Sequence, residues 1–266
     1  MDTISISDIE YEKFCTLIFD EIGITLNEHK KALMESRFYK RIIHYKLNSF
    51  HEYYKICKDD VREKTEMLNL ITTNETYFFR ESDHFDFLKE YLMNYQDPMK
   101  VRIWSAASSV GAEAYSIAMV CDSLLASNKW EVFGTDINKH VIKKARMGLY
   151  PLTWSLKIVP ELRHKYCLKG KGKYEGQFLI DRQLAKNVRF LNSNLLEINS
   201  DFGEFNIVFL RNVLIYFNDE TRKKVLKNIM ANMKSGSLLF ISQTENLNGL
   251  DINELEQVQP SIFKVK

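Results

Sequence analysis

The second half of the sequence contains residues with the types and spacing of a nucleotide-type cofactor site. Residues 108–111 follow a short buried strand predicted at 101–105, and a turn there directs backbone N–H groups and a helix N-terminus towards a ligand. Asp136 ends the next predicted strand, 25 positions after Gly111, where its carboxylate can accept hydrogen bonds from two ribose hydroxyls. The alternative for Asp136 is a helix N-cap or a charge at the sheet edge.

The glycine content of this turn distinguishes between classes of cofactor. Gly111 is the only glycine of the turn, so the motif G-x-G-x-x-G is missing. A dinucleotide pyrophosphate needs the close backbone approach that this motif provides. The sequence therefore disfavours NAD and FAD and favours S-adenosylmethionine, a cofactor without phosphates.

An alternation of strands and helices must position these residues. We expect strands at 101–105, 131–136, 187–191, 205–210 and 238–242, and helices after residue 111, at 139–147 and at 220–233. This pattern predicts an α/β fold with a doubly wound, mostly parallel sheet that binds its ligand beyond the carboxyl ends of the strands. Closely spaced glycines between short strand-like runs at about 166–183 indicate an inserted small antiparallel β-subdomain, with a solvated basic loop as the alternative.

The first half has helical periodicity instead. Helical patterns cover about 11–22, 30–45, 60–71 and 82–95. In the second of these, one face carries an apolar stripe formed by Met34, Phe38, Ile42 and Tyr45. A neighbouring face carries a basic line formed by Lys30, Arg37, Arg41 and His44. We therefore predict a small all-helical N-terminal domain at 1–72, a linker and helix at 73–99 that contribute to the cofactor site, and the α/β domain at 100–266.

The composition excludes several other classes of protein. With 45% hydrophobic and 27% charged residues, ten Gly and four Pro, the chain is neither disordered nor collagen-like. Its 37 basic and 35 acidic residues nearly balance, which gives no bulk charge for nucleic acid. The sequence has no run of 18 apolar residues and no signal-peptide layout at its start, so we expect a cytoplasmic protein without membrane insertion. The four cysteines are far apart and include no C-x-x-C pair, so we expect neither a disulfide framework nor a metal site.

Several motifs, taken in order, resemble those of the CheR-type chemotaxis receptor glutamate O-methyltransferases. They lie at 72–81, 104–107, 111–116, 135–137, 194–196, 211–217 and 244–246, so the resemblance covers nearly the whole chain. It implies methyl transfer from S-adenosylmethionine to glutamate side chains on the cytoplasmic, acidic helices of chemoreceptors, with S-adenosylhomocysteine as the product.

The resemblance also implies which residues form the site. Those expected to line the cofactor are Asn74, Thr76, Arg80, Glu113, Asp136, Asn194, Leu195, Arg211 and Asn212. Arg80 suits a carboxylate such as the methionine end of the cofactor, and Tyr216 follows a strand's carboxyl end, so we predict that both are catalytic residues that orient the reactants. The alternatives are an ion pair of Arg80 with Glu81 or Glu75, and a half-buried core position for Tyr216. A glutamate with a pKa of about 4.3 is already anionic at neutral pH, so no general base and no metal are expected.

Two surfaces are candidates for docking the receptor. The basic face with Lys30, Arg37, Lys40 and Arg41 could steer and dock acidic receptor helices, with plain solvated charge as the alternative. By resemblance, the segment around Gly170, Lys171 and Gly172 is expected to bind a receptor C-terminal pentapeptide by strand addition. Nothing in the sequence demands more than a monomer.

Three positions depart from the family's usual turn, namely Val110, Ala112 and Ala114. These departures raise the alternative of a catalytically weakened homologue that acts as a chemoreceptor- or cofactor-binding adaptor. An amino-methyltransferase of nucleic acid is disfavoured, because 212–215 lacks the prolines of an Asn/Asp-Pro-Pro-Tyr loop and the chain has no extended basic and aromatic track. We accordingly expect no nucleic-acid partner.

Overall fold

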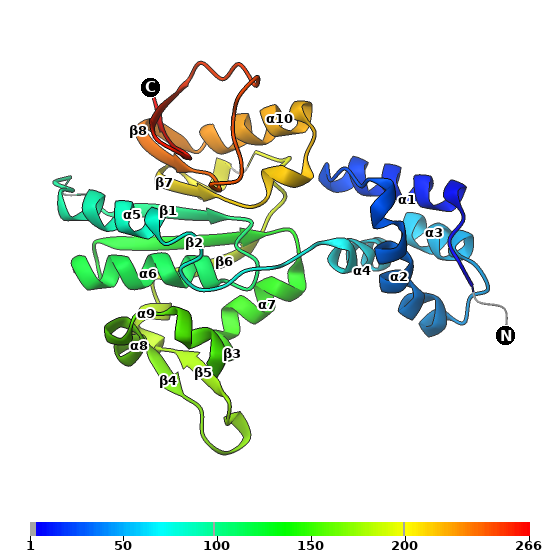
Figure 1. The fold of residues 1–266 in the computed structure, drawn as a ribbon, viewed down its shortest axis with the longest axis horizontal. Coiled ribbons are helices and arrows are strands. Elements are labelled where there is room, and N and C mark those ends of the chain that lie inside the picture. The colour runs from blue at the N-terminus through cyan, green and yellow to red at the C-terminus, as the bar shows by residue number, and fades with distance from the viewer. Residues whose placement is uncertain (1–3, 98, 199) are drawn as a thin grey trace. The chain divides into compact units, whose positions relative to one another are not determined.

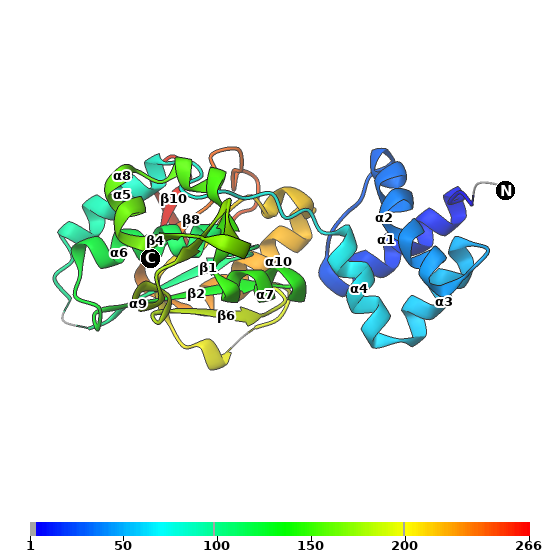
Figure 2. The ribbon, with the colours of Figure 1, turned by 90° about the horizontal axis from the view of Figure 1, so that it is seen from below.

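The computed structural model describes residues 4–97, 99–198 and 200–266, which form two compact units. The helical unit contains the chain up to Thr73 together with the short segment 216–221. The α/β unit contains residues 74–215 and 222–266. Figure 1 and Figure 2 show the ribbon of both units from two directions.

The helical unit is built from four α-helices and one short 3-10 helix. Their bounds are Asp8–Ile22 (α1), Glu28–Lys30 (η1), Lys31–Tyr45 (α2), Phe50–Asp59 (α3) and Val61–Ile71 (α4). The side chain of Ser7 and that of Glu10 form a capping box that begins α1, and Gly23 ends it in the left-handed conformation. The rings of Phe14, Phe38 and Tyr53 pack together at centroid distances of 5.1 to 5.9 Å and make the core of this unit.

The α/β unit contains a seven-stranded sheet. Its strands are Val101–Ala106 (β1), Trp130–Asp136 (β2), Val188–Asn192 (β6), Phe205–Leu210 (β7), Met233–Phe240 (β8), Leu255–Gln259 (β9) and Ile262–Val265 (β10), in the order β6-β2-β1-β7-β8-β10-β9. The first five of these strands run parallel, and β10 pairs antiparallel with β8 and with β9. The doubly wound, mostly parallel sheet is confirmed, while the C-terminal hairpin β9–β10 was not predicted.

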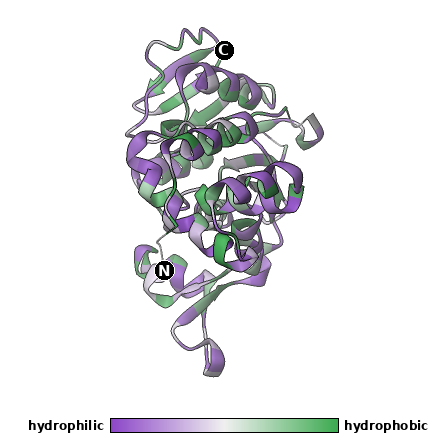
Figure 3. Cartoon of the chain, turned by 90° about the vertical axis from the view of Figure 1, so that its right-hand side faces the viewer, coloured by the Kyte–Doolittle hydropathy of each residue, from purple (hydrophilic) through white to green (hydrophobic). Residues whose placement is uncertain are grey.

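Helices and short 3-10 segments connect these strands. The helices are Asp83–Met93 (α5), Ala112–Leu124 (α6), Lys139–Met147 (α7), Pro160–Tyr166 (α8), Arg182–Ala185 (α9) and Asp219–Met230 (α10), and the 3-10 segments include Leu152–Lys157 (η2), Gly172–Tyr174 (η3), Ser200–Phe202 (η4) and Leu214–Tyr216 (η5). The helix predicted at 220–233 is therefore too long, because Met233 already begins β8 and pairs with Phe205 of β7. Figure 3 shows hydrophobic and hydrophilic residues alternating around the helices.

The apolar face of the sheet explains why the strands stay in register. Ile103, Val132, Ile207 and Phe209 come from three neighbouring strands and join one continuous core cluster with α5 and α6. The rings of Phe209 and Phe240 stack at a centroid distance of 4.4 Å. Burial of these large apolar side chains supplies most of the stabilisation of such a sheet.

A second, three-stranded antiparallel sheet is inserted in the α/β unit. Its strands are Leu149–Pro151 (β3), Cys167–Lys169 (β4) and Gln177–Ile180 (β5), in the order β3-β5-β4. The small antiparallel β-subdomain is thus confirmed, but one of its strands lies before the predicted range 166–183. The ring of Phe78 contacts those of Tyr150 and Phe178 at 5.0 and 5.6 Å, which fixes the small sheet to the core.

Candidate active site at the carboxyl edge of the sheet

The carboxyl ends of β1, β2, β6 and β7 bring several predicted site residues to one edge of the sheet. Asp136 is the last residue of β2, and Arg211 directly follows β7. Glu113 lies in the first turn of α6, the helix that begins after the turn following β1. In a doubly wound sheet this edge is the expected ligand site.

Asp136 fixes the turn after β1. Its side chain accepts hydrogen bonds from the backbone N–H of Ser109 at 2.8 Å and from that of Asn138 at 2.9 Å. Burial raises the pKa of Asp136 to about 6. The N-cap of α7 is Asn138, whose side chain accepts from the N–H groups of His140 and Val141, so the N-cap alternative for Asp136 is wrong. An ionised carboxylate offers about four lone-pair sites, which leaves room at Asp136 for further donors.

The turn itself is tightly packed and conformationally strained. Gly111 has φ of +88°, and a Cβ there would lie 2.8 Å from the ring of Phe190 and 2.9 Å from Ala145. Ala107 and Ser109 also have positive φ, at 60° and 50°. Non-glycine residues rarely adopt this conformation, and it concentrates at functional sites. The turn therefore has the properties of a preformed ligand cradle.

Arg211 lies at the centre of a buried ionic cluster, with only 1% of its side chain exposed. Its guanidinium pairs with the carboxylates of Glu113 and Glu81 at 3.0 and 3.1 Å and donates to the backbone carbonyl of Arg80. Ser105 donates its hydroxyl to the other oxygen of Glu113 at 2.7 Å. Burial raises the pKa of Glu113, and the charge of Arg211 opposes that effect. We call Glu81, Glu113 and Arg211 the Arg211 cluster.

Glu81 and Glu245 are site residues that the sequence interpretation missed. Burial favours the protonated form of Glu81, but the charge of Arg211 and hydrogen bonds that include one from the Gln243 N–H lower its pKa to about 2. Glu245 accepts from the backbone N–H groups of Ser242, Asn212 and Ile215 at 2.8 to 3.3 Å. It thereby holds Asn212, whose φ is 57°, against the end of β8. The sequence signals for them are weak, because Glu81 stands out only as a neighbour of Arg80 and Glu245 only as part of the motif at 244–246.

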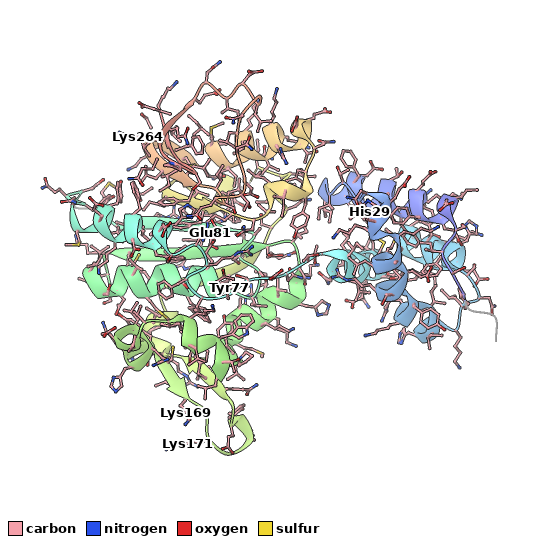
Figure 4. All side chains as sticks on the ribbon, in the orientation of Figure 1. His29, Tyr77, Glu81, Lys169, Lys171 and Lys264 are labelled. Carbon is pink, nitrogen blue, oxygen red and sulfur yellow. The ribbon has the colours of Figure 1, made fainter. Side chains whose placement is uncertain are left out.

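The loop that carries Arg80 is strained on both sides of this residue. Phe79 and Glu81 have φ of 54° and 55°, and a bulky residue such as Phe79 is a genuine outlier there. The Arg80 guanidinium donates to the backbone carbonyl of Glu75 at 3.0 Å and lies 5.8 Å from the Tyr77 ring centroid. Figure 4 labels Tyr77 and Glu81 on this segment. Because Glu81 pairs with Arg211 and Glu75 contributes its carbonyl, the structure does not support the ion-pair alternative for Arg80.

The remaining predicted cofactor residues also belong to the α/β unit. The carbonyl oxygen of Asn74 accepts from the Ser109 hydroxyl at 3.2 Å, and Thr76 is half-buried two positions later. The side chain of Asn194 accepts from the Leu196 N–H at 3.0 Å, and the carbonyl of Leu195 accepts from the Asn228 side chain at 3.0 Å. Direct contact of these residues with a cofactor stays a prediction.

Tyr216 belongs to a different unit from Arg80. It ends η5, is half-buried, and is grouped with the helical unit, where its carbonyl accepts from the Thr25 N–H at 2.9 Å. Arg80 is part of the α/β unit. The joint action of Arg80 and Tyr216 on the reactants therefore stays a prediction.

The predicted docking residues of α2 differ in their surroundings. Arg37 donates to the carbonyls of Leu70, Ile71 and Thr72 at 2.9 to 3.0 Å, which satisfies the end of α4. Arg41 makes a two-point ion pair with Glu63, with an Nε to Oε1 distance of 2.7 Å. Lys30 and Lys40 are exposed. Tyr45, predicted in the apolar stripe, is instead 37% exposed, and its hydroxyl binds Glu63.

Fold and site together define a class of protein. The sheet has the doubly wound order, an acid ends its second strand, and the turn after its first strand has no glycine-rich phosphate loop. Two buried polar atoms at this edge, the Ser108 hydroxyl and Arg211 Nε, have no hydrogen-bond partner within the described part of the chain. The residues present thus fit a nucleoside cofactor that has a charged amino-acid end and no pyrophosphate, as S-adenosylmethionine does.

Comparison with known proteins identifies the family. Residues 9–72 match the CheR methyltransferase all-alpha domain, and residues 74–262 match the CheR methyltransferase SAM binding domain. The chain is 35% identical over 252 residues to a chemotaxis protein methyltransferase of Salmonella typhimurium, with 93% of this chain and 87% of that protein covered. It is 34% identical over 283 residues to chemotaxis protein methyltransferase 1 of Vibrio cholerae, with both chains fully covered. The chain belongs to the CheR chemotaxis protein methyltransferase family, as the resemblance implied.

A separate observation concerns membranes. No helix within the described residues combines the length and the apolar character that crossing a bilayer requires.

Proposed function

We propose that the chain methylates glutamate side chains of chemoreceptors and binds S-adenosylmethionine at the carboxyl edge of its large sheet. Membership of the CheR family, with both of its domains, makes the chain an S-adenosylmethionine-dependent chemotaxis protein methyltransferase. The observation that carries the site is the convergence of Asp136, Glu113, Arg211 and Asn212 on one strained edge.

Each residue has a role suited to its chemistry. Asp136 receives the ribose hydroxyls, because a carboxylate already fixed by two backbone N–H groups still has acceptor capacity. Arg80 binds the cofactor's carboxylate, for which a guanidinium is the best-matched partner. Asn194 and Leu195 meet the adenine edge, while Asn74 and Thr76 border the cradle opposite the turn after β1. Arg211, Glu113 and Asn212 shape the floor of the site.

Methyl transfer depends mainly on how the reactants are positioned. The cofactor, when bound, supplies an electrophilic methyl group. The substrate glutamate has a pKa of about 4.3 in water and is an anionic nucleophile at neutral pH. The task of Arg80 and Tyr216 is then to orient that carboxylate and to keep water from the site, and such effects can account for most of the acceleration.

The turn substitutions favour an active enzyme over an adaptor. The backbone carbonyl of Val110 accepts a hydrogen bond from the Tyr150 hydroxyl at 2.6 Å. This interaction does not depend on the side chain at position 110. Ala112 and Ala114 are fully buried in the core of the α/β unit, so they face packing partners and not a ligand. Glu113, which lies between them, keeps its pair with Arg211.

Two docking surfaces complete the proposal. The exposed Lys30 and Lys40 attract acidic receptor helices, and Arg37 adds positive charge. Arg41 contributes less to this attraction, because its charge is balanced by Glu63. In the small sheet, β4 is an edge strand, and Leu168 and Lys169 on it are exposed. An extended receptor pentapeptide can add to such an edge through backbone hydrogen bonds, next to Gly170, Lys171 and Gly172. We propose that the chain acts on receptors as a monomer.

The test is transfer of labelled methyl groups from S-adenosylmethionine to membranes that contain chemoreceptors. We expect base-labile label on the receptors, because a glutamate methyl ester hydrolyses in base, and loss of that label with Asp136→Ala and with Arg80→Ala. The matched controls are Asp251→Ala and Arg62→Ala, which remove exposed side chains outside the site. Label on nucleic acid instead of receptor would refute the proposal. Cofactor and receptor binding without any transfer would favour the adaptor.

A further inference from the structure

The positive charge of the chain is concentrated in one stretch of the α/β unit. Residues 139–189 contain 13 Lys and Arg but only three Asp and Glu, a net charge of +10. The rest of the chain contains 24 Lys and Arg against 32 Asp and Glu, a net charge of −8. The three acids within the stretch can pair with only three of its cations, and Asp122 outside it pairs with Lys165, so the stretch keeps a large positive excess.

The stretch 139–189 is a contiguous region of the fold. It runs from α7 through the three-stranded sheet to α9 and the start of β6. At its tip, Lys169, Lys171 and Lys173 are exposed, and Figure 4 labels the first two on the hairpin that protrudes from the unit. The Lys173 ammonium lies 5.0 Å from the Tyr174 ring centroid, and Lys165 pairs with Asp122 at 3.2 Å. We call residues 139–189 the basic end.

Large apolar side chains are exposed between these cations. They are Met147 (53% exposed), Leu156 (72%), Val159 (53%), Leu168 (48%) and Tyr174 (45%), and they come from α7, η2, η3, β4 and the residue before α8. Most are aliphatic and suit neither base stacking nor an aromatic platform for nucleic acid. Exposed aliphatic side chains beside lysines have the chemistry to enter the boundary between headgroups and acyl chains of a bilayer.

We propose that the basic end docks on the surface of an anionic lipid bilayer. A lipid surface provides negative charge over an extended area and requires no matching groove, which fits cations distributed over several elements. The apolar side chains would reach the boundary of the acyl chains, without any segment that spans the bilayer. This contact needs no receptor to occur, although its hairpin is also the proposed pentapeptide site.

The charge distribution also determines which side of the α/β unit faces the lipid surface. The basic end is attracted to an anionic surface, while the remainder of the α/β unit, with 13 basic and 17 acidic residues, is repelled by it. Because this attraction is screened over a Debye length of about 8 Å at physiological ionic strength, binding must weaken steeply with salt.

The test uses the full chain and sucrose-loaded vesicles in a sedimentation assay without receptor. We expect the chain to sediment with vesicles of phosphatidylcholine and phosphatidylglycerol at 70:30, at least tenfold more tightly than with pure phosphatidylcholine, and to be released by about 0.5 M salt. The variant Lys169→Glu/Lys171→Glu/Lys173→Glu should lose at least tenfold in affinity. Its control, Lys89→Glu/Lys234→Glu/Lys264→Glu, makes the same charge change at exposed sites of the α/β unit outside the basic end and should bind as the unchanged protein does.

A second variant tests the contribution of the apolar side chains. Leu156→Ser/Leu168→Ser should weaken the part of vesicle binding that survives added salt, because that part comes from apolar contact. Cofactor affinity, measured by calorimetry, should be unchanged in all these variants, which separates a failure here from a failure of the proposed function. Equal binding to both vesicle types, or equal loss in the control triple variant, would overturn the proposal. Tight binding to single-stranded RNA without binding to anionic vesicles would overturn it as well and point to nucleic acid.

Discussion

Each unit of the molecule contains an arginine–glutamate ion pair with one buried partner, Glu63 in the helical unit and Arg211 in the α/β unit, and the two arrangements differ in how completely that partner is hydrogen-bonded. In the helical unit, Glu63 is 3% exposed and accepts two bonds from Arg41 and one each from the hydroxyls of Tyr45 and Tyr53. In the α/β unit, Arg211 serves two carboxylates and a backbone carbonyl, and its Nε has no partner within the described residues.

The backbone around the two groups differs as well. Glu63 and Arg41 lie within regular helices, α4 and α2. In the Arg211 cluster, Glu81 itself has a positive φ, and so do the nearby residues Phe79 and Asn212. A buried glutamate whose acceptors all have partners, on unstrained helices, indicates a structural role. A buried arginine with an unpaired N–H donor, on a strained edge, indicates a ligand site. Three predictions test this contrast.

The largest effect is expected from Arg211→Ala. This change leaves Glu81 and Glu113 without their cation, and breaking a buried pair from one side costs about 3–5 kcal/mol in the free energy of unfolding. It should also abolish measurable binding of S-adenosylmethionine in calorimetry, because the floor of the site loses its central group. The control is Arg102→Ala, which breaks a pair with Glu131 at the opposite, amino end of β1. Unchanged cofactor affinity in Arg211→Ala would show that the Arg211 cluster is only structural.

A smaller effect is expected from Arg41→Met in the helical unit. Urea denaturation should show a loss of about 2–3 kcal/mol, below the range for a fully buried pair, because Arg41 is 22% exposed and two tyrosine hydroxyls still bind Glu63. Cofactor affinity should not change. The double variant Arg41→Met/Glu63→Leu should regain part of the lost stability, since no buried charge is then left unpaired. A matching loss of cofactor affinity would contradict the division of roles between the two units.

The smallest effect concerns pH and Asp136. Its pKa is raised by burial from 3.8 to about 6, so its contribution to folding is fully present below pH 3.8 and is lost as the pH rises through 6. Cofactor affinity should instead decrease as the pH falls, because the ribose hydroxyls bind the ionised form of Asp136. The affinity should fall about tenfold between pH 7 and pH 5. Calorimetry across this range should show the step in the native protein and none in Asp136→Asn. A step of equal size in Asp136→Asn would assign it to another group.

Much of the architecture follows from local sequence patterns. The helix predicted at 139–147 has those bounds in the structure, and the strands that carry Asp136 and precede Arg211 end where they were expected. These elements have strong periodicity and clear end signals such as Gly148 after α7. Asp136 could be placed at the ligand edge because parallel strands direct their carboxyl ends the same way, whereas Glu113 and Arg211 were expected there from the family resemblance.

The missed elements depend on distant partners. The hairpin β9–β10 has a weak alternating pattern and forms because β10 pairs with β8. The helix α3 buries only Phe50, Tyr53 and Cys57, and their packing against α1 and α4 decides its existence. Glu81 bonds with Asn212, 131 positions away, and with Ser242, 161 positions away. No local pattern reports such a contact, so the sequence indicated Asp136 and Glu113 as acids of the site but not Glu81 and Glu245.

The carboxylates at the carboxyl edge have a consequence for hydrogen exchange. Asp136, Glu81 and Glu245 together accept from the backbone N–H groups of Ser109, Asn138, Asn212, Ile215, Ser242 and Gln243. Loop amides of this kind normally exchange rapidly with solvent deuterium, but here their protection depends on acidic side chains and not on a strand ladder. The integrity of the site can therefore be followed amide by amide in the free protein, before any cofactor or receptor is added.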